Sequence, residues 1–288
     1  MIKYSYAICR CLKVLLQVLK RGYFRPSAKK ILNIGNNKKC YILGNGPSLL
    51  NEFLILEDTL AREQTFVVNN FAKSEHYSKI KPAFYVLLDP IFFDDRAILD
   101  NGFEVNARAI IDIILQKTTW PLKIVVASEG CEFLKNRFKT NPNISVYGFN
   151  TFSLDTDTKL DYLFYSRFYA APHIQNVIVG TIFLAVNLGF KEINVLGFDH
   201  SWTEELKVNA KNEVCLISKH FYDEGVKYEL APFYKLYGGV YKMHEALFIY
   251  AKMFYGYHVL NRYARYKSVK IYNCTAGSYV DAFERKLL

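Results

Sequence analysis

A short turn after the first apolar run of the chain has the residue types that bind a phosphate group. Residues 40–43 are apolar, and Gly44, Asn45, Gly46, Pro47 and Ser48 follow directly. A buried strand that ends in a glycine-rich turn presents backbone N–H groups and a helix N-terminus, which together bind anions. The spacing differs from both the G-x-G-x-x-G and the Walker fingerprints. We therefore expect a nucleotide at this turn, with an ordinary strand-to-helix connection as the alternative.

Polar residues also follow the other apolar runs. Asn69 and Asn70 follow one run, Asp89 follows the next, and Asp199 and His200 come shortly after a run at residues 192–196. In open α/β sheets the ligand lies outside the carboxyl ends of the strands. Amide side chains there suit hydrogen bonds to a base, a ribose or a phosphate. We therefore expect these side chains to meet at one edge of a sheet, although each alone is a common turn residue.

Apolar runs alternate with helical segments from residue 39 onward. We expect helices notably at residues 52–62, 174–188 and 241–257. We expect strands at residues 40–43, 65–69, 83–88, 123–127, 145–147, 192–196 and 269–273. β-Branched runs separated by helices are typical of a mostly parallel sheet. The predicted fold is therefore α/β and Rossmann-like, a mostly parallel sheet with helices on both faces and a lid segment at about residues 200–239.

The charge of the chain is strongly positive and unevenly distributed. The 288 residues carry a formal net charge of +10, and residues 1–38 contain no acidic residue. Such a charge attracts anions. No RRM, KH or zinc-finger pattern accompanies it, so we do not expect a nucleic-acid partner. Six cysteines without a C-x-x-C pair predict reduced thiols and no cysteine-based zinc site.

Residues 1–36 are interpreted as a basic amphipathic segment that precedes a catalytic domain at residues 37–288. Arg10 and Lys13 interrupt its apolar run, which is too short and too charged to span a bilayer. The apolar positions at helical spacing are Ile8, Leu12, Leu15, Leu16 and Leu19. This pattern favours a helix on an anionic leaflet, with a helix docked on its own domain or on a partner as the alternative. We accordingly expect a cytoplasmic protein, peripheral on the inner membrane, and leave a homo-oligomer open.

The order of these motifs resembles known families. The Gly-Asn-Gly-Pro-Ser turn, the asparagines Asn69 and Asn70, and the segment from Leu188 to Asp199 are similar to the bacterial sialyltransferases that modify lipooligosaccharide. The same order resembles the broader family of hydroxymethylpterin diphosphokinase MptE-like proteins, which includes proteins of flagellin and surface-polysaccharide glycosylation. The resemblance covers roughly residues 39–204.

The resemblance implies roles for particular residues. In the sialyltransferases the turn and the asparagine after the second strand hold the cytidine monophosphate part of CMP-sialic acid. The corresponding residues here are Gly44, Asn45, Gly46, Ser48, and Asn69 or Asn70. A hydroxyl-bearing turn before the central helix also contacts the donor, and Gly180 and Thr181 are the nearest match. The Gly-x-Asp segment implies a lid over the sugar, from Asp199 to about residue 239.

Two departures from the sialyltransferase pattern bear on the chemistry. Asp89 stands where those enzymes carry an asparagine, as in the MptE-like proteins. An aspartate beside phosphates needs a metal ion or a proton, which leaves metal dependence open. The lid tyrosines that contact the phosphate in those enzymes have no clear counterpart, with Tyr222 as one option. A different nucleotide sugar therefore stays open as the donor.

Glycosyl transfer needs a base that removes the proton of the acceptor hydroxyl, and histidine suits this role because its pKa lies near neutral pH. The lid region from which the sialyltransferases draw their base corresponds to the segment around His220, which is our first choice. His200 is the second choice, because the adjacent Asp199 could orient it or pair with its charge.

The sequence thus predicts an enzyme that moves a sialic-acid-like sugar from a CMP-type donor to a bacterial surface glycan. Inversion at the sugar is implied by the resemblance, and no cofactor is expected besides the donor substrate. One alternative is a diphosphokinase of the MptE-like type, in which Asp89 and Asp199 hold Mg²⁺. Another is a membrane-associated scaffold without activity.

Overall fold

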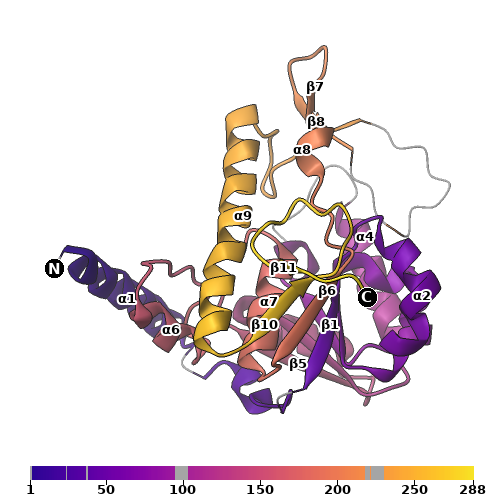
Figure 1. Ribbon diagram of the computed structural model, residues 1–288, viewed down its shortest axis with the longest axis horizontal. Helices are drawn as coiled ribbons and strands as arrows, with labels where there is room; N and C mark the ends of the chain where they lie inside the picture. Colours follow the sequence, from indigo (N-terminus) through magenta and orange to yellow (C-terminus); the bar gives the residue numbers. More distant parts are fainter. Residues whose placement is uncertain (1, 24, 37, 95–102, 218–220, 222–229) are drawn as a thin grey trace.

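The computed structural model describes residues 2–288 except 24, 37, 95–102, 218–220 and 222–229 (Figure 1). Within that part of the chain, eight strands form a central sheet in the order β11-β10-β6-β1-β2-β3-β4-β5. The strands are β1 (Lys39–Leu43), β2 (Thr65–Val68), β3 (Phe84–Leu87), β4 (Leu122–Ala127), β5 (Ile144–Phe149), β6 (Glu192–Leu196), β10 (Lys270–Asn273) and β11 (Glu284–Arg285).

Every pairing in this sheet is parallel, and the strand order reverses at β1. From β1 the chain builds outward through β2, β3, β4 and β5, and it then returns to the other side of β1 through β6 and β10. The adjacent carboxyl ends of β1 and β6 therefore form the topological switch point, where open α/β sheets bind their ligands.

Helices cover both faces of the sheet. They are α1 (Ile2–Arg21), α2 (Leu49–Arg62), α3 (His76–Ile80), α4 (Phe103–Lys117), α5 (Cys131–Phe138), α6 (Lys159–Tyr165), α7 (Val177–Asn187), α8 (Trp202–Glu205) and α9 (Met243–Tyr266). Cys40 and Ile42 of β1 pack on the side of α1, α6, α7 and α9, whereas Tyr41 and Leu43 pack on the side of α2 to α5. Strands that are buried on both faces read as continuous apolar runs. The predicted Rossmann-like α/β fold is confirmed.

Helix α7 lies in the middle of the molecule, and every residue from Ile178 to Asn187 is buried. Asn176 caps this helix, because its side-chain oxygen accepts a hydrogen bond from the Ile178 N–H at 2.8 Å. A side-chain cap of this kind satisfies one of the free N–H groups of the first turn. The cap fixes the start of α7 beside the carboxyl ends of the strands.

The chain leaves the main sheet between β6 and α9 and forms a small excursion. Helix α8 is followed by a three-stranded antiparallel sheet of β7 (Lys207–Val208), β8 (Val214–Leu216) and β9 (Ala231–Pro232). In Figure 1 this part stands above the carboxyl ends of β6 and β1. It corresponds to the predicted lid at residues 200–239, whose closure over a sugar stays a prediction.

The N-terminal segment packs on the domain that follows it. Cys11, Val14 and Val18 of α1 join the core, as do Ala28 and Ile31 of the 3₁₀ helix Ser27–Ile31. No helix among the described residues is both long and apolar enough to cross a bilayer. All six cysteines are free thiols.

Candidate functional site

Two adjoining pockets lie along the carboxyl edge of the sheet. The first, here called the switch-point pocket, has a volume of ≈ 100 Å³ and is lined by residues 44–47, 68, 69, 176–178, 197, 199–202 and 205. The second, here called the aromatic pocket, has a volume of ≈ 470 Å³ and is lined by residues 69, 88–91, 174–177, 233, 234, 236, 241 and 249. Asn69, Asn176 and Val177 line both pockets.

The two glycines of the Gly-Asn-Gly turn allow the turns after β1 and β6 to approach each other closely. A Cβ atom on Gly44 would lie 2.2 Å from the carbonyl oxygen of Gly197. A Cβ atom on Gly46 would lie 1.8 Å from a carboxylate oxygen of Asp199. Both glycines are therefore required by contacts within the protein.

Asp199 occupies the N-terminus of α2. Its Oδ1 accepts a hydrogen bond from the Ser48 N–H at 3.2 Å, and its Oδ2 accepts one from the Ser48 hydroxyl at 2.8 Å. Burial raises the pKa of Asp199, and the two bonds from Ser48 oppose that rise. A carboxylate at a helix N-terminus is favoured by the helix dipole. Both the N–H and the hydroxyl of Ser48 therefore bond Asp199, and the predicted contact of Ser48 with the donor stays a prediction.

The C-terminal turn holds Asp199 in this position. The Thr275 hydroxyl accepts a hydrogen bond from the Phe198 N–H at 2.9 Å, and the Ser278 hydroxyl donates one to the Phe198 carbonyl at 2.5 Å. The Tyr279 N–H donates to the Asp199 carbonyl at 2.9 Å. The turn after β10 thus fixes the backbone from which Asp199 reaches α2.

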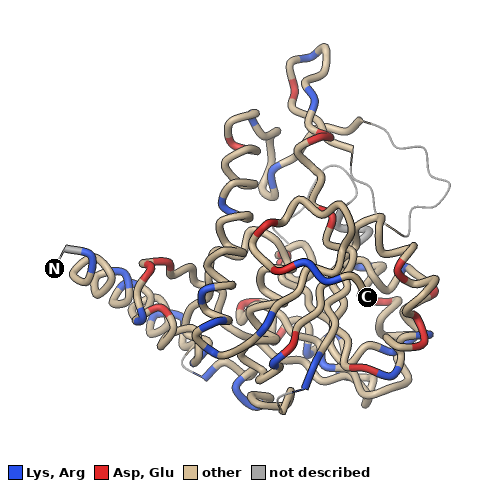
Figure 2. Tube along the Cα trace, in the orientation of Figure 1, with Lys and Arg blue, Asp and Glu red and all other residues tan. Residues whose placement is uncertain are grey.

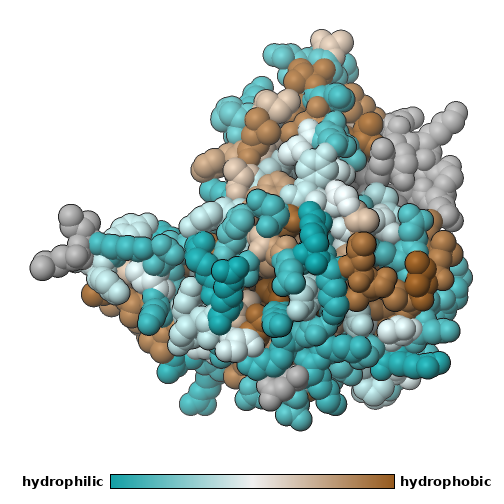
Figure 3. Space-filling model, in the orientation of Figure 1, coloured by the Kyte–Doolittle hydropathy of each residue, from teal (hydrophilic) through white to brown (hydrophobic). Residues whose placement is uncertain are grey.

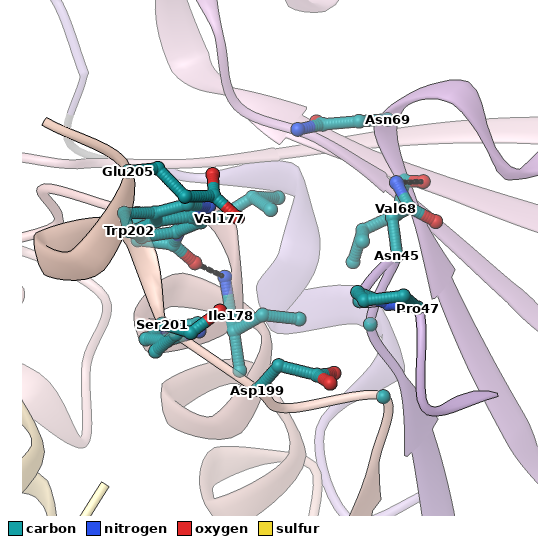
Figure 4. Close-up of a pocket in the computed structure, with 15 residues that line it drawn as sticks. Asn45, Pro47, Val68, Asn69, Val177, Ile178, Asp199, Ser201, Trp202 and Glu205 are labelled. Carbon is teal, nitrogen blue, oxygen red and sulfur yellow. Dashed lines mark hydrogen bonds between the residues drawn. The ribbon is translucent and has the colours of Figure 1, made fainter. Parts of the chain in front are cut away.

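Asn45 and Asn69 line the switch-point pocket, and their side-chain oxygens are buried. The Asn45 amide nitrogen donates to the Val68 carbonyl at 3.2 Å, and in Figure 4 the Asn69 side chain extends toward the side of the pocket formed by Val177. The side-chain oxygens of Asn45 and Asn69 are buried, and within the described residues neither has a hydrogen-bond partner. Most buried polar atoms in proteins are paired, so these two oxygens are candidates to accept hydrogen bonds from a ligand.

Gly180 and Thr181, two further predicted donor-binding residues, line neither pocket. Thr181 is fully buried, and its hydroxyl donates to the Val177 carbonyl at 2.8 Å. Gly180 packs so tightly that a Cβ atom would lie 2.2 Å from the Leu88 side chain. The wall of the switch-point pocket is formed one turn earlier by residues 176–178, and the expected contact of Gly180 and Thr181 with the donor stays a prediction. Of the two neighbouring asparagines, Asn69 lines the pockets and Asn70 does not.

His200 lines the switch-point pocket but is a poor base. The side chain is buried, its Nε2 hydrogen-bonds the Tyr257 hydroxyl at 2.7 Å, and its ring stacks on Trp202. Burial lowers the pKa of His200 to about 3, so the imidazole is neutral and weakly basic. These contacts favour a packing role for His200, and its expected role as the base stays a prediction.

His220, the first choice as base, lies outside the described residues, as does Tyr222. The adjacent Phe221 is described and is buried against Phe53 and Phe71. Its N–H donates a hydrogen bond to the Asn45 carbonyl at 3.2 Å. The chain at Phe221 therefore contacts the turn after β1.

The aromatic pocket combines one carboxylate with aromatic side chains. Asp89 accepts a hydrogen bond from the Ile91 N–H at 3.2 Å, and burial raises the pKa of this carboxyl. Phe233 and Tyr241 form part of the wall, and their rings lie 4.6 Å apart between centroids. Among the described residues, no group of three or more His, Cys, Asp or Glu side chains could hold a metal ion. Asp89 and Asp199, the two expected Mg²⁺ ligands, line different pockets.

Sequence reasoning missed two residues at this edge. Glu52 in α2 accepts a hydrogen bond from the Gly197 N–H at 3.1 Å, and burial raises the pKa of its carboxyl to about 7. No local pattern distinguishes it from an ordinary helix residue. Asn176 caps α7, and an asparagine before an apolar helical run is a recognisable start signal.

The comparisons with known proteins are sparse. No protein-family model matches the chain, and no curated protein matches it. Among solved structures, the MAf glycosyltransferase from Magnetospirillum magneticum AMB-1 is similar with 16% identity and a TM-score of 0.49. The similarity covers 87% of this chain and 33% of that one, so this chain spans about a third of its length. A similarity at this level assigns no activity, and the resemblance to sialyltransferases and MptE-like proteins stays an expectation.

Proposed function

We propose that the chain transfers a sugar from a nucleotide donor, with the nucleoside in the switch-point pocket and the sugar in the aromatic pocket. The observation that carries this proposal is the pair of buried side-chain oxygens of Asn45 and Asn69, which lack a partner within the described residues. An unsatisfied buried acceptor costs roughly 1–3 kcal/mol. A nucleoside suits these two acceptors because its amino and hydroxyl groups donate hydrogen bonds, and such bonds would remove this cost.

The donor phosphate binds at the N-terminus of α7 in this proposal. Asn176 and Val177 line both pockets, so this N-terminus lies where a nucleoside and a sugar would be joined. The positive end of the helix dipole favours an anion there. The other helix N-terminus at this edge, that of α2, already has the Asp199 carboxylate.

The charges of the pockets favour a CMP-type donor over a diphosphate donor. The described residues that line the two pockets include the carboxylates of Asp89, Asp199 and Glu205 and no Lys or Arg. The phosphate bridge of a CMP-sugar has one negative charge, whereas a pyrophosphate bridge has two, which Mg²⁺ or cationic side chains usually neutralise. A sialic-acid-like sugar adds the charge of its own carboxylate, away from the phosphate. A sialic-acid-like sugar and a surface-glycan acceptor follow from the sequence resemblance alone.

Asp89 is the group that we propose as base among the described residues. Its carboxylate lies in the aromatic pocket, where Phe233 and Tyr241 offer apolar surfaces to the C–H face of a sugar. The raised pKa brings its proton affinity nearer the operating pH. In a single displacement, Asp89 takes the proton of the acceptor hydroxyl as the phosphate leaves the opposite face of the sugar, which inverts that carbon. His220 stays the alternative base from the sequence.

The test is release of CMP from CMP-sialic acid in the presence of a galactose-terminated glycan, with Asp89→Asn and His220→Ala beside the unchanged chain. We expect Asp89→Asn to lower kcat about 100-fold or more, the usual contribution of a general base, with CMP binding nearly unchanged. Loss of turnover in His220→Ala alone would transfer the role to His220. Absence of turnover with every CMP-sugar would overturn the proposed function.

The second candidate is the Mg²⁺-dependent diphosphokinase, for which the carboxylate of Asp89 in the aromatic pocket is the supporting observation. Asp89 could bind Mg²⁺ that accompanies ATP, because carboxylate oxygens are preferred ligands of this ion. Asp199 lines the other pocket and already accepts two hydrogen bonds from Ser48. This reaction would make AMP from ATP and a pterin-like alcohol. Formation of AMP only when Mg²⁺ and that alcohol are present would favour it over glycosyl transfer.

A further inference from the structure

Helix α1 has two separate apolar faces. Ala7, Cys11, Val14 and Val18 are buried against the domain. A second set forms the exposed face, here called the α1 apolar stripe: Tyr4 (61% exposed), Ile8 (51%), Leu12 (54%), Leu16 (63%) and Leu19 (54%). At 3.6 residues per turn the centres of the two faces lie roughly 110° apart around the helix axis. Docking on the domain therefore leaves the stripe uncovered, and Figure 3 shows apolar residues along the lower edge of this arm.

The stripe continues onto a neighbouring pocket between α1, α6 and α9. This pocket has a volume of ≈ 370 Å³, and Tyr4 of the stripe lines it together with Leu163 and Tyr266. Lys159 and Lys267 line the same pocket. Tyrosine beside lysine is a typical combination at the level of lipid headgroups, where the ring is half in contact with acyl chains and the ammonium reaches phosphate.

Basic residues border the α1 apolar stripe, and α1 contains no acidic residue. Lys3 pairs with Asp157 at 2.7 Å and Arg21 pairs with Glu129 at 2.7 Å, so these two hold α1 against the domain. Lys13 and Lys20 lie beside the stripe on the helical wheel and form no ion pair with the described residues. Figure 2 shows Lys and Arg spaced along this arm, and residues 1–38 contain no Asp or Glu.

We propose that the α1 apolar stripe binds the surface of an anionic phospholipid bilayer, with α1 lying in the plane of the interface. A helix of 20 residues is about 30 Å long, enough to place all five stripe residues at the acyl boundary. Lys13 and Lys20 then face anionic headgroups. A second copy fits less well, because it would bring the same lysines together with no acidic partner on α1. This proposal is independent of the proposed function.

The first test is flotation of the full chain with vesicles of phosphatidylcholine containing about 30% phosphatidylglycerol, and with vesicles of phosphatidylcholine alone. We expect binding to the anionic vesicles, and its loss to background in Ile8→Ser/Leu12→Ser/Leu16→Ser. The matched control is Leu54→Ser/Ile55→Ser, which changes two residues of α2 that are 83% and 76% exposed. We expect this control to bind as the unchanged chain does. Circular dichroism and the urea midpoint check that all variants are folded.

The second test is Lys13→Glu/Lys20→Glu on the same vesicles. Each basic residue near the surface contributes roughly fivefold in affinity, so we expect at least about a 25-fold loss. Salt at about 0.5 M should weaken binding of the unchanged chain in the same direction. Failure of the unchanged chain to float would overturn the proposal, as would full binding by the triple serine variant. A dimer in solution that the triple serine variant dissociates would assign the stripe to a second copy instead.

Discussion

The carboxylate of Asp199 is an anion, and it occupies the anion-binding position at the glycine-rich turn. Its carboxylate receives two hydrogen bonds from Ser48, a residue 151 positions away in the sequence. A Gly-Asn-Gly-Pro-Ser turn predicts an anion at the start of the following helix, because the helix dipole and free N–H groups favour one. The local pattern does not distinguish a phosphate from a carboxylate of the same chain, so the bonds between Ser48 and Asp199 could not be predicted from it.

A substitution of Asn69 tests whether the switch-point pocket binds a nucleoside. Its φ of 46° favours Asn or Gly, so Asn69→Gly removes the side chain without straining the backbone. We expect the unfolding free energy to stay equal or to rise by up to about 1–3 kcal/mol, because the substitution removes a buried acceptor that has no partner within the described residues. We expect CMP binding by calorimetry to weaken about tenfold, the contribution of one hydrogen bond.

The matched control is Asn141→Ala. The Asn141 amide donates to the carbonyls of Leu115 and Thr118 at 3.0 and 2.9 Å, away from both pockets. This variant should lose stability and keep its affinity for CMP. Equal CMP affinity in Asn69→Gly and the unchanged chain would remove Asn69 from the binding site.

Glu52 gives the molecule a pH-dependent stability with a defined sign. Burial raises the pKa of its carboxyl from 4.5 to about 7 in the folded chain. A raised pKa means that the folded state binds the proton more tightly, so this contribution is complete below about pH 4.5 and is lost as pH rises through about 7. Glu52→Gln keeps an acceptor oxygen for the Gly197 N–H and has no carboxyl to ionise.

We therefore expect Glu52→Gln to be more stable than the unchanged chain at about pH 8, by on the order of 1–3 kcal/mol, and nearly equal to it at about pH 4.5. Urea unfolding at several pH values measures the difference. A difference that stays constant across this range would mean that the Glu52 carboxyl titrates normally.

At the scale of elements, the junction between β1 and β6 depends on glycine. Gly46→Ala would place a Cβ atom 1.8 Å from the Asp199 carboxylate and 2.8 Å from the Gly197 carbonyl oxygen. We expect this change to cost about 2–3 kcal/mol of unfolding free energy, as overpacking does. Asp199→Gly removes the nearer clash, so in a double-mutant cycle we expect coupling of at least about 1 kcal/mol. Additive effects of the two substitutions would show that the turn relaxes without Asp199.

Continuous apolar runs predicted the positions of the strands well. Apolar periodicity predicted the starts of the helices less well. The strand at residues 192–196 was predicted to the residue, and that at 40–43 within one residue of β1. The helix predicted at residues 174–188 begins at Val177, because Asn176 caps it. Apolar periodicity does not define a helix start, so it did not locate residues 176–178 at the pocket. The strands β7, β9 and β11 have two residues each, too few for any pattern.

For the molecule as a whole, the strand order decides where the site lies. The sheet reverses at β1 and β6, and the switch-point pocket opens between their carboxyl ends. The sequence predicted this edge, because polar residues follow each apolar run. It did not predict the long-range contacts that set the chemistry, such as the bond between His200 and Tyr257 that makes the imidazole a packing group.

The net charge of +10 is separate from the proposed site, because the described residues that line the two pockets include no Lys or Arg. The positive charge therefore acts at long range on anions and, in our proposal, on an anionic bilayer at α1. Binding of the donor depends instead on the helix dipole of α7 and on the acceptors of Asn45 and Asn69.

The most direct test of the central claim is a calorimetric titration of the full chain with CMP and with ATP, each with and without Mg²⁺. The account predicts binding of CMP in the micromolar range without Mg²⁺, and weaker binding in Asn69→Gly. Binding of ATP only with Mg²⁺, together with no binding of CMP, would contradict it and favour the diphosphokinase.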